Sequence, residues 1–138
     1  MTNIFKQLEN KVAHYRLNKA TLNQLKKSFG EFPYKATRTE ITGIIFIEKG
    51  VKNEDLKLIG ELTGLRELCI LSNQISKIEG LDKLNNLQVL NLAGNQITKI
   101  EGLNNLNNLR ELDLRKNNIP KSQIDQFKAT NKKIKVNV

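Results

Sequence analysis

The chain has 138 residues, a net charge of +9, one cysteine and no tryptophan. This length fits a single domain, and a lone cysteine excludes a disulfide framework within the chain. Polar residues interrupt every apolar run, so we expect neither a signal peptide nor a membrane-spanning helix, which needs roughly 20 apolar residues. We therefore expect a cytoplasmic protein, or a nuclear one if the cell is eukaryotic.

The first 40 residues carry much of the positive charge, with eight basic residues against three acidic ones. Their apolar spacing predicts two helices, over about 3–17 and 22–29, interrupted at Asn18. The second would begin at a capping box on Thr21 and end at Gly30. One apolar face of the first helix would hold Phe5, Leu8, Val12 and Tyr15. Two interpretations remain open: a cap that shields the first strand, or an amphipathic arm for a partner or an anionic membrane.

Residues 41–61 resemble a divergent copy of a unit that recurs downstream. The pattern Ile41-x-x-Ile44-x-Phe46 returns 24 residues later as Leu65-x-x-Leu68-x-Ile70. Such alternation favours a short strand with one buried face. After this strand we expect a helix from Asn53 to Glu61, with Asn53 as its N-cap.

Two closely similar units then follow with a period of 22 residues. The first runs from Leu62 to Leu81 and the second from Leu84 to Leu103, with every marked apolar position repeated. A third copy begins at Leu106 and degenerates after Pro120. One unit cannot bury its apolar face alone, so the units must stack.

Each unit contains a strand, a turn amide and a return path. The turn amide is an asparagine that can hydrogen-bond the backbone where the strand ends, and stacking would align these amides in a ladder. Apolar residues three apart then predict a tight, 3₁₀-like return. The predicted ladder consists of Asn73, Asn95 and Asn117.

The end of the chain alternates apolar and polar residues from Ile134 to Val138, which predicts a last strand whose lysines cover the open sheet edge. We accordingly divide the chain into an N-terminal helical cap at 1–40, a repeat solenoid at 41–127 and a basic strand or tail at 128–138.

The phrase Asn-Gln-Ile-x-Lys-Ile-Glu-Gly-Leu occurs at 73–81 and again at 95–103. This motif resembles the SDS22-like class of 22-residue leucine-rich repeats. The resemblance is close over 62–127 and loose over 41–61. The resemblance implies an α/β fold: a right-handed solenoid with a parallel β-sheet on its concave face and an N-terminal helical cap. It also implies a non-enzymatic scaffold that binds a protein or peptide on that face.

The concave face should carry the strand residues that alternate with the buried leucines. Its N-terminal half is apolar and its C-terminal half is charged, which favours a protein partner held by apolar contact and oriented by charge. Alternatively, the N-terminal helices fold over the apolar half. The predicted partner-binding residues are Ile45, Ile47, Glu67, Cys69, Leu71, Val89, Asn91, Ala93, Glu111, Asp113 and Arg115.

Other chemistry finds little support in the sequence. His14 is the only histidine, Cys69 has no histidine near it in the chain, and no cluster has metal-ligand spacing. We expect no cofactor, no catalytic residue and no small-molecule substrate. Two alternatives to protein binding are a basic adaptor that binds RNA or DNA through the charged ends, and a self-associating structural protein.

Overall fold

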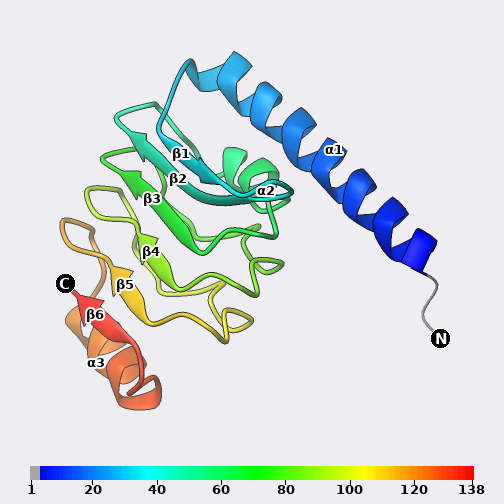
Figure 1. The fold of residues 1–138 in the computed structure, drawn as a ribbon. Coiled ribbons are helices and arrows are strands. Elements are labelled where there is room, and N and C mark those ends of the chain that lie inside the picture. Colours follow the sequence, from blue (N-terminus) through cyan, green and yellow to red (C-terminus); the bar gives the residue numbers. More distant parts are fainter. Residues whose placement is uncertain (1–3) are drawn as a thin grey trace.

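The computed structural model describes residues 4–138, except for the side chains of Ile4, Phe5, Leu8 and Tyr15. Three helices and six strands are arranged as one curved stack (Figure 1). In chain order they are α1 (Ile4–Phe29), β1 (Tyr34–Ala36), β2 (Ile41–Ile47), α2 (Asp55–Ile59), β3 (Glu67–Leu71), β4 (Val89–Asn91), β5 (Glu111–Asp113), α3 (Lys121–Thr130) and β6 (Lys135–Asn137).

All six strands form one sheet in the order β1 to β6. Strands β2 to β6 run parallel, which confirms the predicted parallel sheet, and β6 forms the predicted last strand. Strand β1 was not predicted. It pairs antiparallel with β2, where Tyr34 faces Ile44 and Lys35 faces Gly43, and so forms the first edge of the sheet.

The core is a continuous wedge of leucine and isoleucine behind the sheet. Most of the marked apolar positions of the two good repeats, such as Leu68, Leu81 and Leu90, are at most 1% exposed, whereas Leu103 is 7% exposed and Ile100 is half-buried. The last part of the return path, from Leu81 to Leu87, consists of two successive three-residue turns: the Leu84 amide donates to the Leu81 carbonyl, and the Leu87 amide to that of Leu84. The expected 3₁₀-like bonds are therefore present from Leu81 to Leu87, whereas among the described residues none joins Ile75 to Ile78 or Ile78 to Leu81.

The N-terminal segment is one helix, so the predicted interruption at Asn18 and the capping box on Thr21 are wrong. Asn18 is 2% exposed, and its side-chain amide donates to the His14 carbonyl at 2.9 Å. Asn18, Thr21, Leu22 and Leu25 are all buried. Their spacing makes one continuous helical stripe against the solenoid, and this packing outweighs the local stop signals.

Helix α1 lies across the end of the sheet and its amino-terminal half extends beyond the body (Figure 1). Its carboxyl end is anchored by Leu25, which is fully buried, and by the Phe29 ring 5.4 Å from that of Phe46. Farther out, Val12 and Leu17 are about half exposed, at 48% and 49%. The apolar face predicted on Phe5, Leu8 and Tyr15 lies outside the described side chains.

The helix predicted over 53–61 is shorter than expected and has no Asn53 cap. Helix α2 begins at Asp55, after Glu54, which makes no capping side-chain bond. Asn53 instead accepts the amides of Ser76 and Lys77 in the next repeat, at 2.9 and 3.1 Å. The Asn53 side chain, which we predicted to cap the helix, therefore bonds to the next repeat instead. No helix in the described part of the chain is long and apolar enough to cross a membrane.

Candidate protein-binding surface

The three asparagines hold the ends of neighbouring strands together. Asn95 donates through its side-chain nitrogen to the carbonyls of Ile70 and Leu92, at 2.7 and 3.0 Å, and accepts the Ile75 amide at 3.0 Å. In the same manner Asn73 donates to the Phe46 carbonyl and accepts the Val51 amide. Asn117 donates to the Leu92 carbonyl and accepts the Ile97 amide. Because each amide satisfies backbone groups of two repeats, the ladder fixes the spacing at which the strands stack.

Strand register places the outward side chains in rows across the sheet. One row contains Gly43, Glu67, Val89, Glu111 and Lys135. The next contains Ile45, Cys69, Asn91, Asp113 and Asn137. At the carboxyl ends Ile47 pairs with Leu71, and Ala93 and Arg115 follow their strands in the corresponding positions. The predicted concave residues thus lie together on one face.

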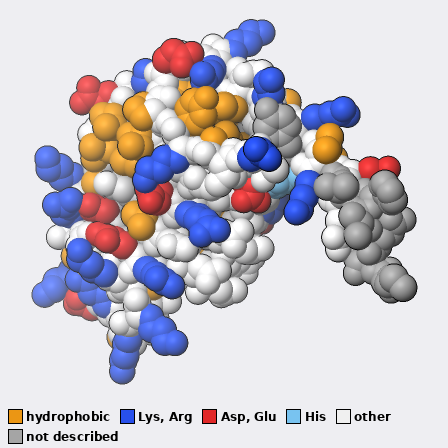
Figure 2. Space-filling model, in the orientation of Figure 1, with side chains coloured by type: hydrophobic (Ala, Val, Ile, Leu, Met, Phe, Trp, Pro, Cys, Tyr) orange, Lys and Arg blue, Asp and Glu red, His pale blue; other side chains and the backbone are white. Residues whose placement is uncertain are grey.

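The half of this face over β2 to β4 is apolar and open to solvent. Ile45, Ile47 and Val89 are 38%, 48% and 36% exposed, whereas Cys69 and Leu71 are half-buried. We call these five residues the concave apolar patch. Figure 2 shows hydrophobic side chains gathered near the carboxyl ends of β2 and β3, and charged side chains over β5 and β6. Helix α1 packs at the sheet's end, so it leaves the patch uncovered. Ala93 differs from the rest because it is 4% exposed.

A shallow hollow of about 290 Å³ lies within the apolar half of the face. Ile45, Cys69 and Val89 line it from the central strands, and Tyr34 and Lys35 line it from β1. Gly43 also lines the hollow without a side chain of its own, and the stem of Lys35 lies against it. Tyr34 and Lys35 were missed in the sequence because a three-residue strand after Pro33 has no periodic signal.

Charges on the concave face occur as pairs between or within strands. Lys35 lies 2.6 Å from Glu67, Lys135 lies 3.4 Å from Glu111, and Arg115 lies 2.6 Å from Asp113. The Arg115 hydrogen bond holds the pKa of the buried Asp113 carboxyl below its usual value, although burial opposes it. Three acids and three bases cancel, so this face is neutral on a chain of charge +9.

The Cys69 thiol lies on this face in a setting that disfavours nucleophilic chemistry. Burial raises the pKa of the Cys69 thiol, which lowers its nucleophilic thiolate fraction. Among the described residues, no group of three or more His, Cys, Asp or Glu side chains is arranged to hold a metal ion. His14 lies on α1, 3.5 Å from Glu40, far along the chain from Cys69.

Comparisons with known proteins agree with this architecture. Residues 85–129 match a family model described as leucine-rich repeats, two copies. The fold resembles an internalin from Listeria monocytogenes, with a TM-score of 0.62, 29% identity and coverage of 88% of this chain and 38% of the internalin chain. The chain thus spans less than half of that protein's length. A search of curated proteins gives no match.

Two other solved structures are less similar. The leucine-rich-repeat ectodomain of the receptor kinase SOBIR1 from Arabidopsis thaliana gives a TM-score of 0.49 at 18% identity, covering 80% of this chain and 86% of that chain. A leucine-rich-repeat protein of Leptospira interrogans gives 0.33 at 19%, covering 59% and 33%. The 22-residue period, the asparagine ladder and the likeness to the internalin show that this chain has the fold of a leucine-rich-repeat solenoid, and the family match covers residues 85–129 of it.

Proposed function

We propose that the concave apolar patch binds a protein or peptide partner, and that the chain acts as a non-enzymatic scaffold. The observation that carries this proposal is the patch itself: five apolar side chains from three adjacent strands, uncovered by α1, with three of them more than a third exposed. Contiguous apolar surface of this kind on a folded domain is typical of interaction sites. The hollow beside Tyr34 would accept a large apolar side chain of the partner.

The neutral charge of the face supports a protein partner over a polyanion at this site. A nucleic acid is attracted by unpaired lysine and arginine, whereas the cations here are already paired with acids. Paired charges around an apolar centre also resemble the polar rim of protein interfaces. These ion pairs would orient the partner, because a misplaced partner would separate a pair and leave one of its charges without a counterion.

Two finer assignments belong to the same proposal. The 22-residue period and the repeated Lys-Ile-Glu-Gly-Leu phrase support the SDS22-like class. A single free, half-buried cysteine supports a cytoplasmic location, where disulfides are rare. Localisation of a fluorescently tagged chain in its own cell tests the second assignment.

The experiment that tests partner binding compares three apolar-to-acid variants. Ile47→Glu and Leu71→Glu introduce charge into the patch, and Leu17→Glu introduces the same charge at a position on α1 that is as exposed as Ile47. We expect a partner that cross-links to the wild type and to the Leu17 variant but not to either patch variant. Purified partner should then bind with the same ranking in calorimetry.

Circular dichroism melts separate binding from folding in these variants. Unchanged melts with lost binding support the patch as the interface. Equal binding by all four proteins would refute the proposal. Light scattering over a concentration series shows whether the partner is a second copy of this chain, because mass would then rise with concentration in the wild type and the Leu17 variant but not in the two patch variants.

A further inference from the structure

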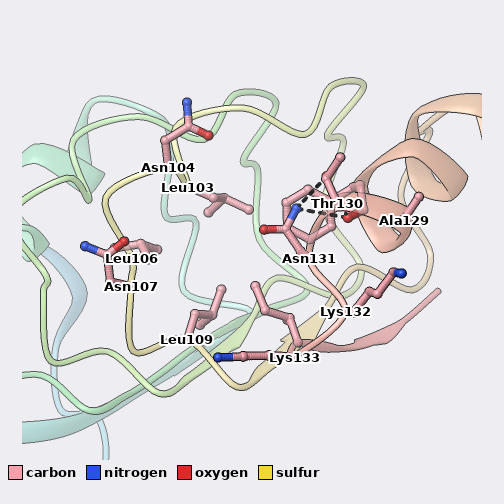
Figure 3. Close-up of a pocket in the computed structure, with 12 residues that line it drawn as sticks. Leu103, Asn104, Leu106, Asn107, Leu109, Ala129, Thr130, Asn131, Lys132 and Lys133 are labelled. Atoms are coloured by element: carbon pink, nitrogen blue, oxygen red, sulfur yellow. Dashed lines mark hydrogen bonds between the residues drawn. The ribbon is translucent and has the colours of Figure 1, made fainter.

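A second candidate site lies at the opposite end of the solenoid, away from the concave apolar patch. It is a pocket of about 520 Å³ between the last row of repeat leucines and the segment that joins α3 to β6 (Figure 3). Its twelve lining residues are Leu103, Asn104, Leu106, Asn107, Leu109, Phe127, Ala129, Thr130, Asn131, Lys132, Lys133 and Ile134. We call it the terminal pocket.

The pocket lies where the end of α3 and the segment that joins it to β6 cover the last leucine row incompletely. Phe127 and Ile134 pack against the core, and apart from Ala129 the other lining residues from α3 and this segment are polar. Strand β6 pairs with β5 at an offset of 24 residues, with Glu111 opposite Lys135. That offset places Thr130 over Leu106 and Lys133 over Leu109. Leu103, Leu106 and Leu109 are 4–7% exposed. The equivalent leucines one repeat earlier, Leu81, Leu84 and Leu87, are 0% exposed.

Stability alone would favour an apolar residue at position 133, since it would complete the stack over Leu109. Lys133 occupies this position instead, and its side chain is exposed. In Figure 3 the Lys133 side chain extends along the pocket toward Leu109, whereas Lys132 extends in the opposite direction. A residue that breaks a packing rule without a structural gain marks a candidate functional position.

The electrostatics of this end differ from those of the concave face. Residues 116–138 contain six lysines and a single acid, Asp125. None of the residues that line the pocket is acidic, and Lys132 and Lys133 form no ion pair with the described residues. Glu111 of the sheet is already engaged by Lys135 and Asn137. Glu101 lines an adjoining hollow and limits the anionic site on that side.

Amide groups complete the pocket chemistry. Within the described part of the chain, the side chains of Asn104 and Asn107 form no hydrogen bond to the protein, whereas Asn131 donates to Phe127. Free amides can pair with the donor and acceptor edges of unpaired bases, which a duplex hides in its centre. Phe127 lines the same pocket and is half-buried.

We propose that the terminal pocket binds single-stranded nucleic acid, with Lys133 and Lys132 contacting phosphate and the asparagine amides contacting base edges. The chain then carries two separate binding surfaces, a neutral one for protein and a basic one for RNA or DNA. The charge complementarity selects a polyanion, and the recessed shape with free amides favours a single strand over a flat anionic membrane.

The test uses the whole chain and a fluorescent oligouridylate of about 12 nucleotides, with oligothymidylate as the DNA arm. Lys133→Leu removes one charge and fills the pocket, and Lys128→Leu removes one charge from α3 outside the pocket. By anisotropy we expect Lys133→Leu to weaken binding at least about tenfold and to lower the salt slope by about 0.7. Lys128→Leu should change affinity less than about threefold, as expected for an exposed charge that does not line the pocket and is screened by salt.

The same two variants give a structural readout that does not depend on any ligand. Lys133→Leu should raise the melting temperature by roughly 3–5 °C, because it completes the leucine stack. Lys128→Leu should leave it unchanged. Should Lys133→Leu misfold, Lys133→Glu supplies the binding measurement. No oligonucleotide binding at low salt, equal loss in both variants, or binding only to phosphatidylserine vesicles would overturn the proposal.

Discussion

The side-chain amide of Asn95 donates a hydrogen bond of 2.7 Å to the carbonyl oxygen of Ile70, one repeat earlier in the stack. The same side chain accepts the Ile75 amide, and Asn95 is only 6% exposed. Water cannot replace a partner at such a buried site. The repeat boundary therefore depends on one amide group to satisfy donors and acceptors on both sides.

Replacing Asn95 with alanine should destabilise the fold by roughly 2–4 kcal/mol, since it leaves the Ile75 amide and a carbonyl buried without partners. Asn117→Ala is the matched change at the less buried end of the ladder, and it should cost about half as much. Urea denaturation followed by circular dichroism measures both. Equal losses of unfolding free energy in the two variants would mean that burial does not determine how much each ladder asparagine stabilises the fold.

Helix α1 contains a second matched pair, Leu25 and Leu17. Leu25 is fully buried against the first repeat, whereas Leu17 is 49% exposed. Leu25→Ala should lose about 2–5 kcal/mol because it opens a cavity, and Leu17→Ala should stay within about 0.5 kcal/mol of the wild type. If both changes are neutral in urea denaturation, α1 is an arm that does not contribute to the core.

The strands and their outward rows were predictable because a period of 22 residues repeats the same environment. Once Leu68 and Leu90 are assigned to the core, strand alternation places Cys69 and Asn91 on the opposite face. Once one residue is assigned to the buried or the exposed face, the residues 22 positions before and after it are assigned to the same face.

The features that were missed depend on contacts between segments without a shared period. Asn18 looks like a helix interruption, yet its side chain bonds His14 within α1 and accepts the Ile41 amide at 3.5 Å. Strand β1 exists only because β2 offers an unpaired edge, so the ion pair between Lys35 and Glu67 had no local signal. The terminal pocket follows from the 24-residue register of β6, which the 22-residue repeats do not reveal.

Cys69 offers a chemical reporter for the concave face. Because burial raises the pKa of its thiol, the thiolate fraction near neutral pH is lower than in the unfolded chain. Iodoacetamide should therefore alkylate Cys69 more slowly in the folded protein than in urea, with a rate that rises steeply with pH. A bound partner should slow the reaction further, and Ile47→Glu should remove that protection. Alkylation unaffected by partner would place the interface elsewhere.

The Arg115–Asp113 pair should make stability depend on pH in the acidic range. The folded-state pKa of Asp113 lies below its unfolded value, mainly through the Arg115 hydrogen bond. The pair therefore contributes stability above the unfolded pKa of about 3.9, and the contribution disappears as pH falls through the folded value. Arg115→Met should lower the melting temperature at neutral pH and converge with the wild type at lower pH.

Thermal melts from neutral pH down to about pH 2 measure that convergence, over the range in which carboxyl groups titrate. Lys83→Met is a suitable control, because it breaks a 2.8 Å pair with Glu61 in which both side chains are well exposed. Solvent screens such a pair, so its removal should shift the melts little at any pH. A difference between Arg115→Met and the wild type that stays constant with pH would show that Arg115 stabilises the fold by packing, because only the charge interaction with Asp113 titrates in this range.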